Sequence, residues 1–282
     1  MKTIADYQAA YASGREVREV MRELWERIAG EPDEGIFITK SPWAWIEAQV
    51  TELDGKSELP LYGIPFAVKD NIDVAGLPTT AACPAFAYEP AESAPVVRLL
   101  QEAGAICVGK TNLDQFATGL VGVRTPYPVP KNAFDPEYLP GGSSSGSAVA
   151  VAKGLAVFSL GTDTAGSGRV PAAFNELVGL KPTRGYLSTR GVVDACKSLD
   201  CVSIFAHSCA EAERVLRLVA QSDEEEAWSR TAPSLWPTFR RRFRFGVPKA
   251  EELDYHAWDA AADLFAEAVK QLEALGGEAV EI

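Results

Sequence analysis

Apolar residues near the start of the chain recur at helical spacing. Over residues 3–29, charged residues separate them, which predicts an amphipathic helix. Its apolar face is formed by Val17, Val20, Met21 and Leu24. A second helix is predicted over residues 41–53, with Ser41 as the N-cap and Pro42 at the first helical position. Residues 1–60 are therefore expected to form a helical arm that packs on the core.

From residue 61 onward, short apolar runs alternate with helical patterns. The runs typical of buried strands cover residues 64–68, 105–108, 157–160, 178–180 and 202–206. Between them, helical patterns cover residues 96–103, 147–154 and 210–220. This alternation predicts an α/β fold with a mixed β-sheet core and helices on both faces. No fixed-period repeat indicates a solenoid.

The pattern changes at residues 221–242, which hold an acidic cluster, two prolines and three consecutive arginines. We expect an exposed connection there. Beyond it, a strand is predicted over residues 243–247, a helix over 255–275, and the start of another strand over 278–282. Because a domain rarely ends inside a strand, we expect more polypeptide after Ile282. Residues 61–282 are then one domain that lacks its C-terminal part.

Composition restricts the class of protein. A chain of 282 residues with 47% hydrophobic residues is typical of a globular enzyme, and a net charge of −12 disfavours nucleic-acid binding. No apolar span predicts membrane insertion or export, so a cytoplasmic location is expected. The five cysteines include no Cys-x-x-Cys pair, which favours free thiols over disulfides or a metal site. No cofactor is predicted.

The chain contains few histidines that could act as a catalytic base. The only two are His207, after an apolar strand, and His256, in a late charged helix, so a Ser-His-Asp triad has few candidates. Lys69 directly follows the apolar run 64–68 and is the alternative base. A free lysine is protonated at neutral pH, so Lys69 requires burial or positive neighbours to become one.

Two serines lie in glycine-rich segments. Ser167 is part of Thr-Ala-Gly-Ser-Gly, where small residues allow backbone N–H groups to converge on an oxyanion. Ser143 follows Gly141 and Gly142, and its hydroxyl could relay a proton between Ser167 and Lys69. The Gly/Ser segment also fits a flexible loop or a phosphate cradle. The absence of a Gly-x-x-x-x-Gly-Lys-Ser/Thr motif disfavours nucleotide binding.

Taken together, the segments 67–70, 141–147 and 161–171 resemble the amidase signature family, whose members hydrolyse amides. The resemblance implies the amidase signature fold and a Ser-cisSer-Lys triad. Lys69 would be the base, Ser143 the relay after a cis peptide bond, and Ser167 the nucleophile. Ser167 follows Ser143 by 24 positions, the spacing associated with that family.

The same resemblance assigns the neighbours of the nucleophile. The backbone N–H groups of the four residues ending at Ser167 would form the oxyanion hole, which here are Thr164, Ala165, Gly166 and Ser167. Asp163 and Arg169 flank them, and we expect an ion pair that shapes the loop.

Residues 119–127, 188–193 and 198–203 resemble the allophanate hydrolase branch of the family, a likeness that extends over residues 62–220. It implies a small anionic amide, allophanate, as substrate, and a functional link to urea carboxylase in urea breakdown. The residues that hold the substrate carboxylate are expected beyond Ile282, which leaves Arg124 as the upstream candidate for substrate binding.

Two alternatives remain open: an amidase for another small amide, or an inactive fragment or assembly component. The apolar faces of the N-terminal helices fit either a homodimer contact or packing on the chain's own core.

Overall fold

The computed structural model describes residues 1–231, 242–256 and 258–282, and it divides the chain into two compact units, Met1–Ala232 and Pro233–Ile282. The predicted division into residues 1–60 and 61–282 stays a prediction. The N-terminal helices belong to the core of the first unit, whereas residues 233–282 form a unit of their own.

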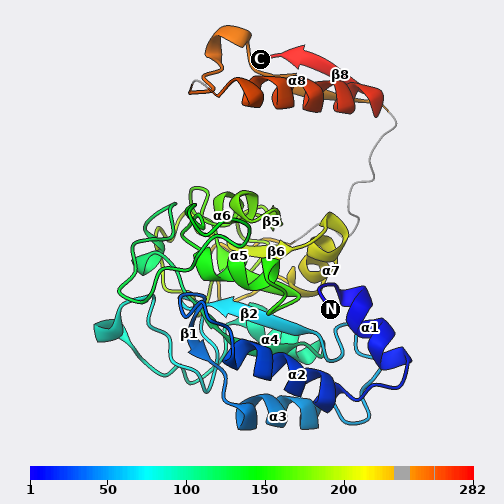
Figure 1. The fold of residues 1–282 in the computed structure, drawn as a ribbon, viewed down its shortest axis with the longest axis vertical. Coiled ribbons are helices and arrows are strands. Elements are labelled where there is room, and N and C mark those ends of the chain that lie inside the picture. The colour runs from blue at the N-terminus through cyan, green and yellow to red at the C-terminus, as the bar shows by residue number, and fades with distance from the viewer. Residues whose placement is uncertain (232–241, 257) are drawn as a thin grey trace. The chain divides into compact units, whose positions relative to one another are not determined.

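The first unit is built on a six-stranded sheet (Figure 1) with the strand order β1-β3-β2-β4-β6-β5. The strands are β1 Phe37–Lys40, β2 Pro65–Lys69, β3 Ile106–Thr111, β4 Phe158–Thr162, β5 Val178–Leu180 and β6 Val202–Ala206. Strand β2 pairs in parallel with β3 and β4, whereas β1 and β6 run antiparallel to their neighbours β3 and β4. The predicted mixed sheet is confirmed, and β2, which ends in Lys69, lies inside it.

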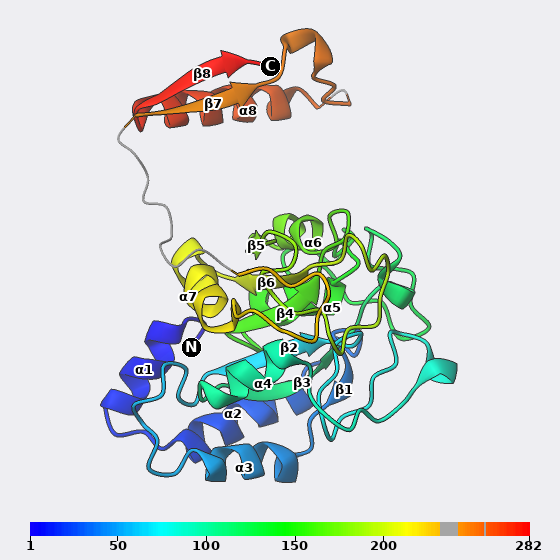
Figure 2. The same cartoon turned by 180° about the vertical axis from the view of Figure 1, so that it is seen from behind.

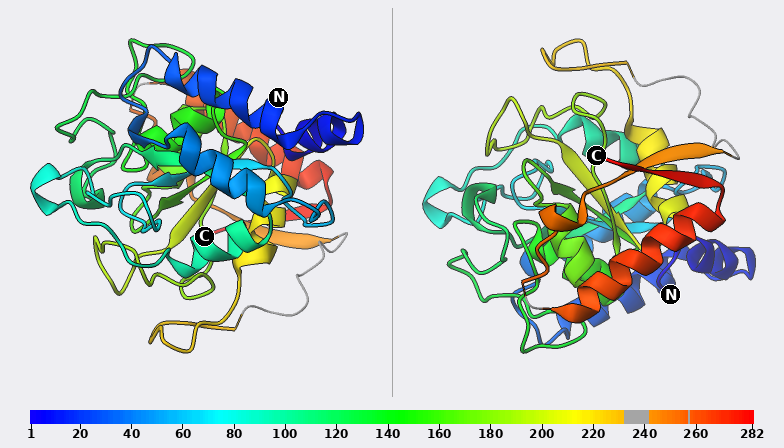
Figure 3. Two further views of the ribbon diagram at one scale, coloured as in Figure 1. Left: turned by 90° about the horizontal axis from the view of Figure 1, so that it is seen from below. Right: turned by 90° about the horizontal axis from the view of Figure 1, so that it is seen from above.

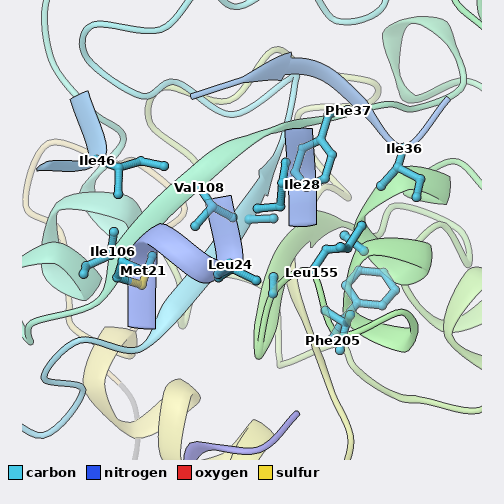
Figure 4. Packing of buried hydrophobic residues seen from close by; sticks show 14 of the residues in the cluster. Met21, Leu24, Ile28, Ile36, Phe37, Ile46, Ile106, Val108, Leu155 and Phe205 are labelled. Atoms are coloured by element: carbon cyan, nitrogen blue, oxygen red, sulfur yellow. The ribbon is translucent and has the colours of Figure 1, made fainter. Parts of the chain in front are cut away.

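Helices cover both faces of this sheet, as predicted. They are α1 Ile4–Ala12, α2 Val17–Ala29, α3 Trp43–Glu52, α4 Pro95–Glu102, α5 Ser145–Ala152, α6 Arg169–Phe174 and α7 Cys209–Val219, with short 3-10 turns at Pro84–Phe86 and Gln115–Ala117. On one face, side chains of α2 such as Leu24 and Ile28 pack near Val108 of β3 and Leu155 (Figure 4). Seen from behind, α4 and α7 lie together (Figure 2), and α7 contacts β5 and β6.

The single helix predicted over residues 3–29 is wrong, because two helices occupy this segment. The first, α1, is capped by Thr3, whose hydroxyl accepts a hydrogen bond from Asp6 N at 3.1 Å. Gly14 then adopts φ of +92°, a left-handed conformation that ends the helical path before α2 begins at Val17. Ser41, the N-cap predicted for the next helix, is also wrong. Pro42, with an extended ψ of 148°, is the N-cap of α3.

The acidic segment after α7 is not simply exposed. In its described part, Asp223 Oδ2 accepts hydrogen bonds from Arg190 Nε at 2.7 Å and from Ser188 Oγ at 2.6 Å, while Arg230 N donates to Gly185 O at 2.7 Å. These contacts fasten residues 223–230 to residues 185–190. The two prolines of the predicted connection and the first two of its three consecutive arginines lie outside the described residues.

The second unit contains two parallel strands that are connected by one helix. Its elements are β7 Phe243–Val247, the 3-10 turn Ala250–Glu252, α8 Asp259–Ala274 and β8 Gly277–Glu281. Strands β7 and β8 pair in register from Phe243 with Gly277 to Val247 with Glu281, and α8 contacts β8 (Figure 3). The predicted strand 243–247 is confirmed, and the predicted helix begins at residue 259 rather than 255.

Candidate active site

Lys69 ends the central strand β2 and is buried completely. Its Nζ lies 2.8 Å from Ser143 Oγ and 2.7 Å from Thr162 Oγ1. Burial lowers the pKa of Lys69 to about 7, although the carboxylates of Asp114, Asp163 and Asp200 act in the opposite direction. A large fraction of the amine is therefore neutral at neutral pH and able to accept a proton.

Ser143 reaches Lys69 from the turn before α5. The peptide bond between Gly142 and Ser143 is cis, as the resemblance implied. Gly142 is closely enclosed: a Cβ there would lie 2.2 Å from Asp114 Oδ2 and 2.5 Å from Gly122 N, so a larger residue would displace these neighbours. The Ser143 carbonyl also accepts a hydrogen bond from Asp114 N at 3.0 Å. These contacts hold the Ser143 hydroxyl at the lysine amine.

Ser167 lies in the loop between β4 and α6, and 4% of it is exposed. The loop is joined to the Ser143 turn, since Ser144 N donates to Ser167 O at 3.2 Å. The Ser167 hydroxyl donates to Gly119 O at 3.4 Å. Among the hydrogen bonds of the described residues, none links the hydroxyls of Ser143 and Ser167. In this conformation the Ser167 hydroxyl is therefore directed at Gly119 and not at Ser143.

Asp163 organises the loop that carries Ser167. Its carboxylate accepts backbone N–H bonds from Gly166 at 2.8 Å, Gly168 at 3.2 Å and Arg169 at 3.1 Å. The expected ion pair is present, with Arg169 Nε 2.9 Å from Asp163 Oδ2. Burial acts to raise the pKa of Asp163, but the hydrogen bonds from Arg169 and Gly166 outweigh it and hold this pKa below its usual range. The carboxylate therefore remains charged and keeps the loop folded.

This arrangement changes the expected set of oxyanion donors. The N–H of Gly166 is already bonded to Asp163, so it is not free for a substrate oxygen in this conformation. The N–H groups of Thr164, Ala165 and Ser167 make no hydrogen bond to any of the described residues. The candidate oxyanion hole consists of these three groups, of which one belongs to the nucleophile itself.

Three further residues that were not predicted, Thr162, Asp114 and Asp200, contact the site. Thr162 ends β4, and its hydroxyl contacts Lys69. The carboxylate of Asp114 accepts N–H bonds from Gly122 at 3.0 Å and from Arg124 at 2.8 Å. Asp200 accepts a hydrogen bond from the hydroxyl of Thr164. Thr162 could have been suspected from its place five positions before Ser167 in the same motif. Asp200 lies in the segment 198–203 that carries the resemblance, but its contact with Thr164, 36 positions away, could not be read from that segment.

Arg124 shows only loop contacts. It is exposed, and its Nη1 donates to Thr118 O at 3.1 Å. Its role in substrate binding therefore stays a prediction. His207, interpreted as structural, has Nε2 3.1 Å from Val151 O in α5.

Within residues 1–231, 242–256 and 258–282, no group of three His, Cys, Asp or Glu side chains is arranged to hold a metal ion. None of the helices there combines the length and apolarity needed to span a bilayer.

The candidate site thus brings together a buried lysine, a serine hydroxyl 2.8 Å from its amine and a second serine in a loop with free N–H groups. The sequence pattern of the amidase family matches residues 19–282, and the chain belongs to this family.

Two relatives within the family show the extent of the similarity. The chain is 54% identical over 231 residues to the urea amidolyase of Saccharomyces cerevisiae, an alignment that covers 81% of this chain and 12% of that protein. It is 42% identical over 277 residues to a glutamyl-tRNA(Gln) amidotransferase subunit of Symbiobacterium thermophilum, an alignment that covers 93% of this chain and 56% of the relative.

A solved structure, allophanate hydrolase of Kluyveromyces lactis, superimposes with a TM-score of 0.92 at 43% identity and covers 99% of this chain and 47% of that one. The chain thus spans about half or less of the length of these relatives.

Proposed function

We propose that this chain hydrolyses a small amide, with Ser167 as nucleophile, Ser143 as relay and Lys69 as base. The observation that carries the proposal is the 2.8 Å contact between Lys69 Nζ and Ser143 Oγ in a site where burial lowers the lysine pKa to about 7. A lysine poised near the working pH is suited to take a proton and return it.

The reaction follows from these positions. Ser167 Oγ attacks the amide carbon, and its proton passes through the Ser143 hydroxyl to Lys69. The tetrahedral oxyanion accepts hydrogen bonds from the free N–H groups of residues 164, 165 and 167, each worth roughly 3–4 kcal/mol of barrier. When the C–N bond breaks, the proton returns by the same route to the leaving ammonia. Water then hydrolyses the acyl-enzyme and releases Ser167.

Allophanate is the substrate that we propose. The likeness to urea amidolyase and to a solved allophanate hydrolase supports it. On this proposal the reaction releases ammonia from the terminal amide of a carboxylated urea, so a urea carboxylase supplies the substrate. The likeness to the glutamyl-tRNA(Gln) amidotransferase, which extends over 93% of the chain, favours a second candidate, another small carboxamide such as the side chain of glutamine.

Ammonia release across a substrate panel tests the proposal. The panel contains allophanate, malonamate and glutamine, each with the wild-type chain and with Ser167→Ala. Turnover of allophanate that is lost in Ser167→Ala supports the proposal, and turnover of glutamine alone supports the second candidate. Equal rates in the wild type and in Ser167→Ala would refute the assignment of the nucleophile.

Labelling with a probe tests the reactivity of Ser167 separately from the choice of amide substrate. A serine-directed acylating probe followed by peptide mapping is expected to mark Ser167. If Ser167 is labelled while none of the three amides is turned over, the chain carries the catalytic residues but lacks part of the substrate site.

A further inference from the structure

Asp70 and Lys110 form a buried ion pair at the end of β2, next to the candidate base. Their closest atoms, Lys110 Nζ and Asp70 Oδ1, are 3.3 Å apart, and both side chains have an exposed fraction of 0%. Asp70 follows Lys69 directly in the chain, while Lys110 on β3 precedes Thr111, the residue that pairs with Lys69. Within the described part of the chain, neither charged side chain hydrogen-bonds to Lys69, Ser143 or Ser167.

Such a pair is costly to maintain. Each buried ion loses several kcal/mol of hydration, and the attraction between the two charges compensates only when the geometry is good. Asp70 Oδ1 makes no hydrogen bond, so the ammonium of Lys110 is its sole compensation among the described residues. A buried ion pair is weak evidence for added stability, and its position is the better guide to its role.

The pair joins β2 and β3 to the turn at residues 78–82. The remaining N–H groups of Lys110 donate to Pro78 O at 3.1 Å and to Thr79 Oγ1 at 3.0 Å. On the other side, Asp70 Oδ2 accepts the hydroxyl of Thr80 and, at 3.0 Å, its N–H. Both charges are thus used to hold the same turn.

That turn supports the segment facing Ser167. Ala81 and Ala82 are left-handed, with φ of 50° and 55°, a conformation that costs non-glycine residues roughly 1–2 kcal/mol each. The Ala81 carbonyl accepts a hydrogen bond from Phe116 N at 2.9 Å. Three residues further along, the Gly119 carbonyl accepts the hydroxyl of Ser167. A continuous series of contacts therefore leads from the ion pair to the nucleophile.

We propose that Asp70 and Lys110 are positioning residues for catalysis: the buried pair fixes Lys69 at the end of β2 and, through residues 78–82, fixes the Gly119 segment against Ser167. This inference rests on the proposed function, in which Lys69 and Ser167 take part in the reaction. Because the side-chain contacts of Asp70 and Lys110 among the described residues involve none of the three catalytic side chains, their effect should fall on the rate of the chemical step rather than on probe binding.

The test measures acylation of Ser167 by a fluorophosphonate probe at increasing probe concentrations. Lys110→Met is compared with Lys153→Met, a matched control whose lysine pairs with Glu31 at 2.7 Å near the surface. Misplacement of reacting groups by about 1 Å costs about 100-fold in rate, so we expect Lys110→Met to lose about that factor in maximal rate. The half-saturating probe concentration should change less than about threefold. Lys153→Met should match the wild type in both.

A second variant separates positioning from folding. Asp70→Asn/Lys110→Met removes both charges, so it should regain stability in urea relative to Lys110→Met. Its maximal rate per folded molecule, with the folded fraction taken from circular dichroism, should stay low. A double variant that regains both stability and rate would overturn the proposal. So would a Lys110→Met rate per folded molecule within about threefold of the wild type.

If Lys110→Met does not fold, Thr80→Val replaces it, because it removes one hydrogen bond to Asp70 and keeps both charges. We expect about a tenfold loss of maximal rate from this smaller change, and an unchanged rate would overturn the proposal. Ser167→Ala distinguishes the two levels of failure. If Ser167→Ala is labelled like the wild type, the proposed function fails; if it is unlabelled while Lys110→Met reacts normally, only the positioning role fails.

Discussion

The buried amine of Lys69 should make the stability of the fold depend on pH. Its pKa is about 7 in the folded chain against an ordinary value of 10.5, so the unfolded chain binds a proton that the folded chain does not between these two pH values. By linkage, stability rises with pH across this window. The shift corresponds to about 5 kcal/mol between pH values below 7 and above 10.5, at 1.36 kcal/mol per pKa unit.

Replacing Lys69 with Met removes this titration and keeps an unbranched side chain of similar length. At pH 6 the buried ammonium destabilises the wild type, so Lys69→Met should be the more stable of the two. From pH 6 to pH 9 the free energy of unfolding of the wild type should gain about 3 kcal/mol relative to Lys69→Met, about 1.4 kcal/mol for each pH unit above 7.

Urea unfolding of both proteins at pH 6, 7, 8 and 9 measures this difference. Other titrating groups change both proteins equally and cancel in the comparison. Lys153→Met is the control, because it makes the same replacement at a partly exposed lysine outside the candidate site. A constant difference between the wild type and Lys69→Met would show that the pKa of Lys69 is not lowered, and would refute the reasoning.

Three further predictions follow from the site. Ser143→Ala should lower the rate of Ser167 acylation by about 100- to 10,000-fold, the usual contribution of positioned proton transfer, and a near-normal rate in a probe assay would exclude the relay. Gly142→Ala should lower the free energy of unfolding in urea by well over roughly 1 kcal/mol, because its Cβ would lie 2.2 Å from Asp114 Oδ2. Gly55→Ala is the control: Gly55 has a positive φ but no atom within 4 Å of an added Cβ, so it should lose only roughly 1 kcal/mol. Equal losses would contradict the close packing at Gly142. Asp163→Asn should weaken the Arg169 ion pair, so acylation should slow by about tenfold or more through loss of loop order, and an unchanged rate would contradict that role.

Local pattern was enough to predict the parts of the fold that depend on neighbouring residues. The apolar runs predicted the strands that became β2, β4 and β6, and Lys69, which follows the run 64–68, has the burial that a lysine base requires. The break at Gly14 was missed because the apolar spacing continues on both sides of a glycine whose left-handed φ only the structure shows. Residue chemistry alone suggested Ser143 as a relay but left a flexible loop or a phosphate cradle open, and the family resemblance selected the relay role.

Contacts that depend on how a loop folds back or on how strands pair could not be predicted in this way. Asp163 was expected to pair with Arg169, but not to occupy the N–H of Gly166, because that bond depends on how the loop folds back. The burial of Lys110 against Asp70 depends on the pairing of β2 with β3, which joins residues about forty positions apart. The bond from Gly166 to Asp163 decides which of the predicted N–H groups are free to bind an oxyanion.

The central claim is that neutral Lys69 drives the attack of Ser167. The most direct measurement is the pH dependence of Ser167 acylation, with the modified serine identified by peptide mapping. The claim predicts a rate that rises with pH and reaches half its maximum near pH 7, where Lys69 loses its proton. In Lys69→Met the rate should be far lower, and this rise should be absent. A wild-type rate that does not change around pH 7, or a label on another residue, would contradict it.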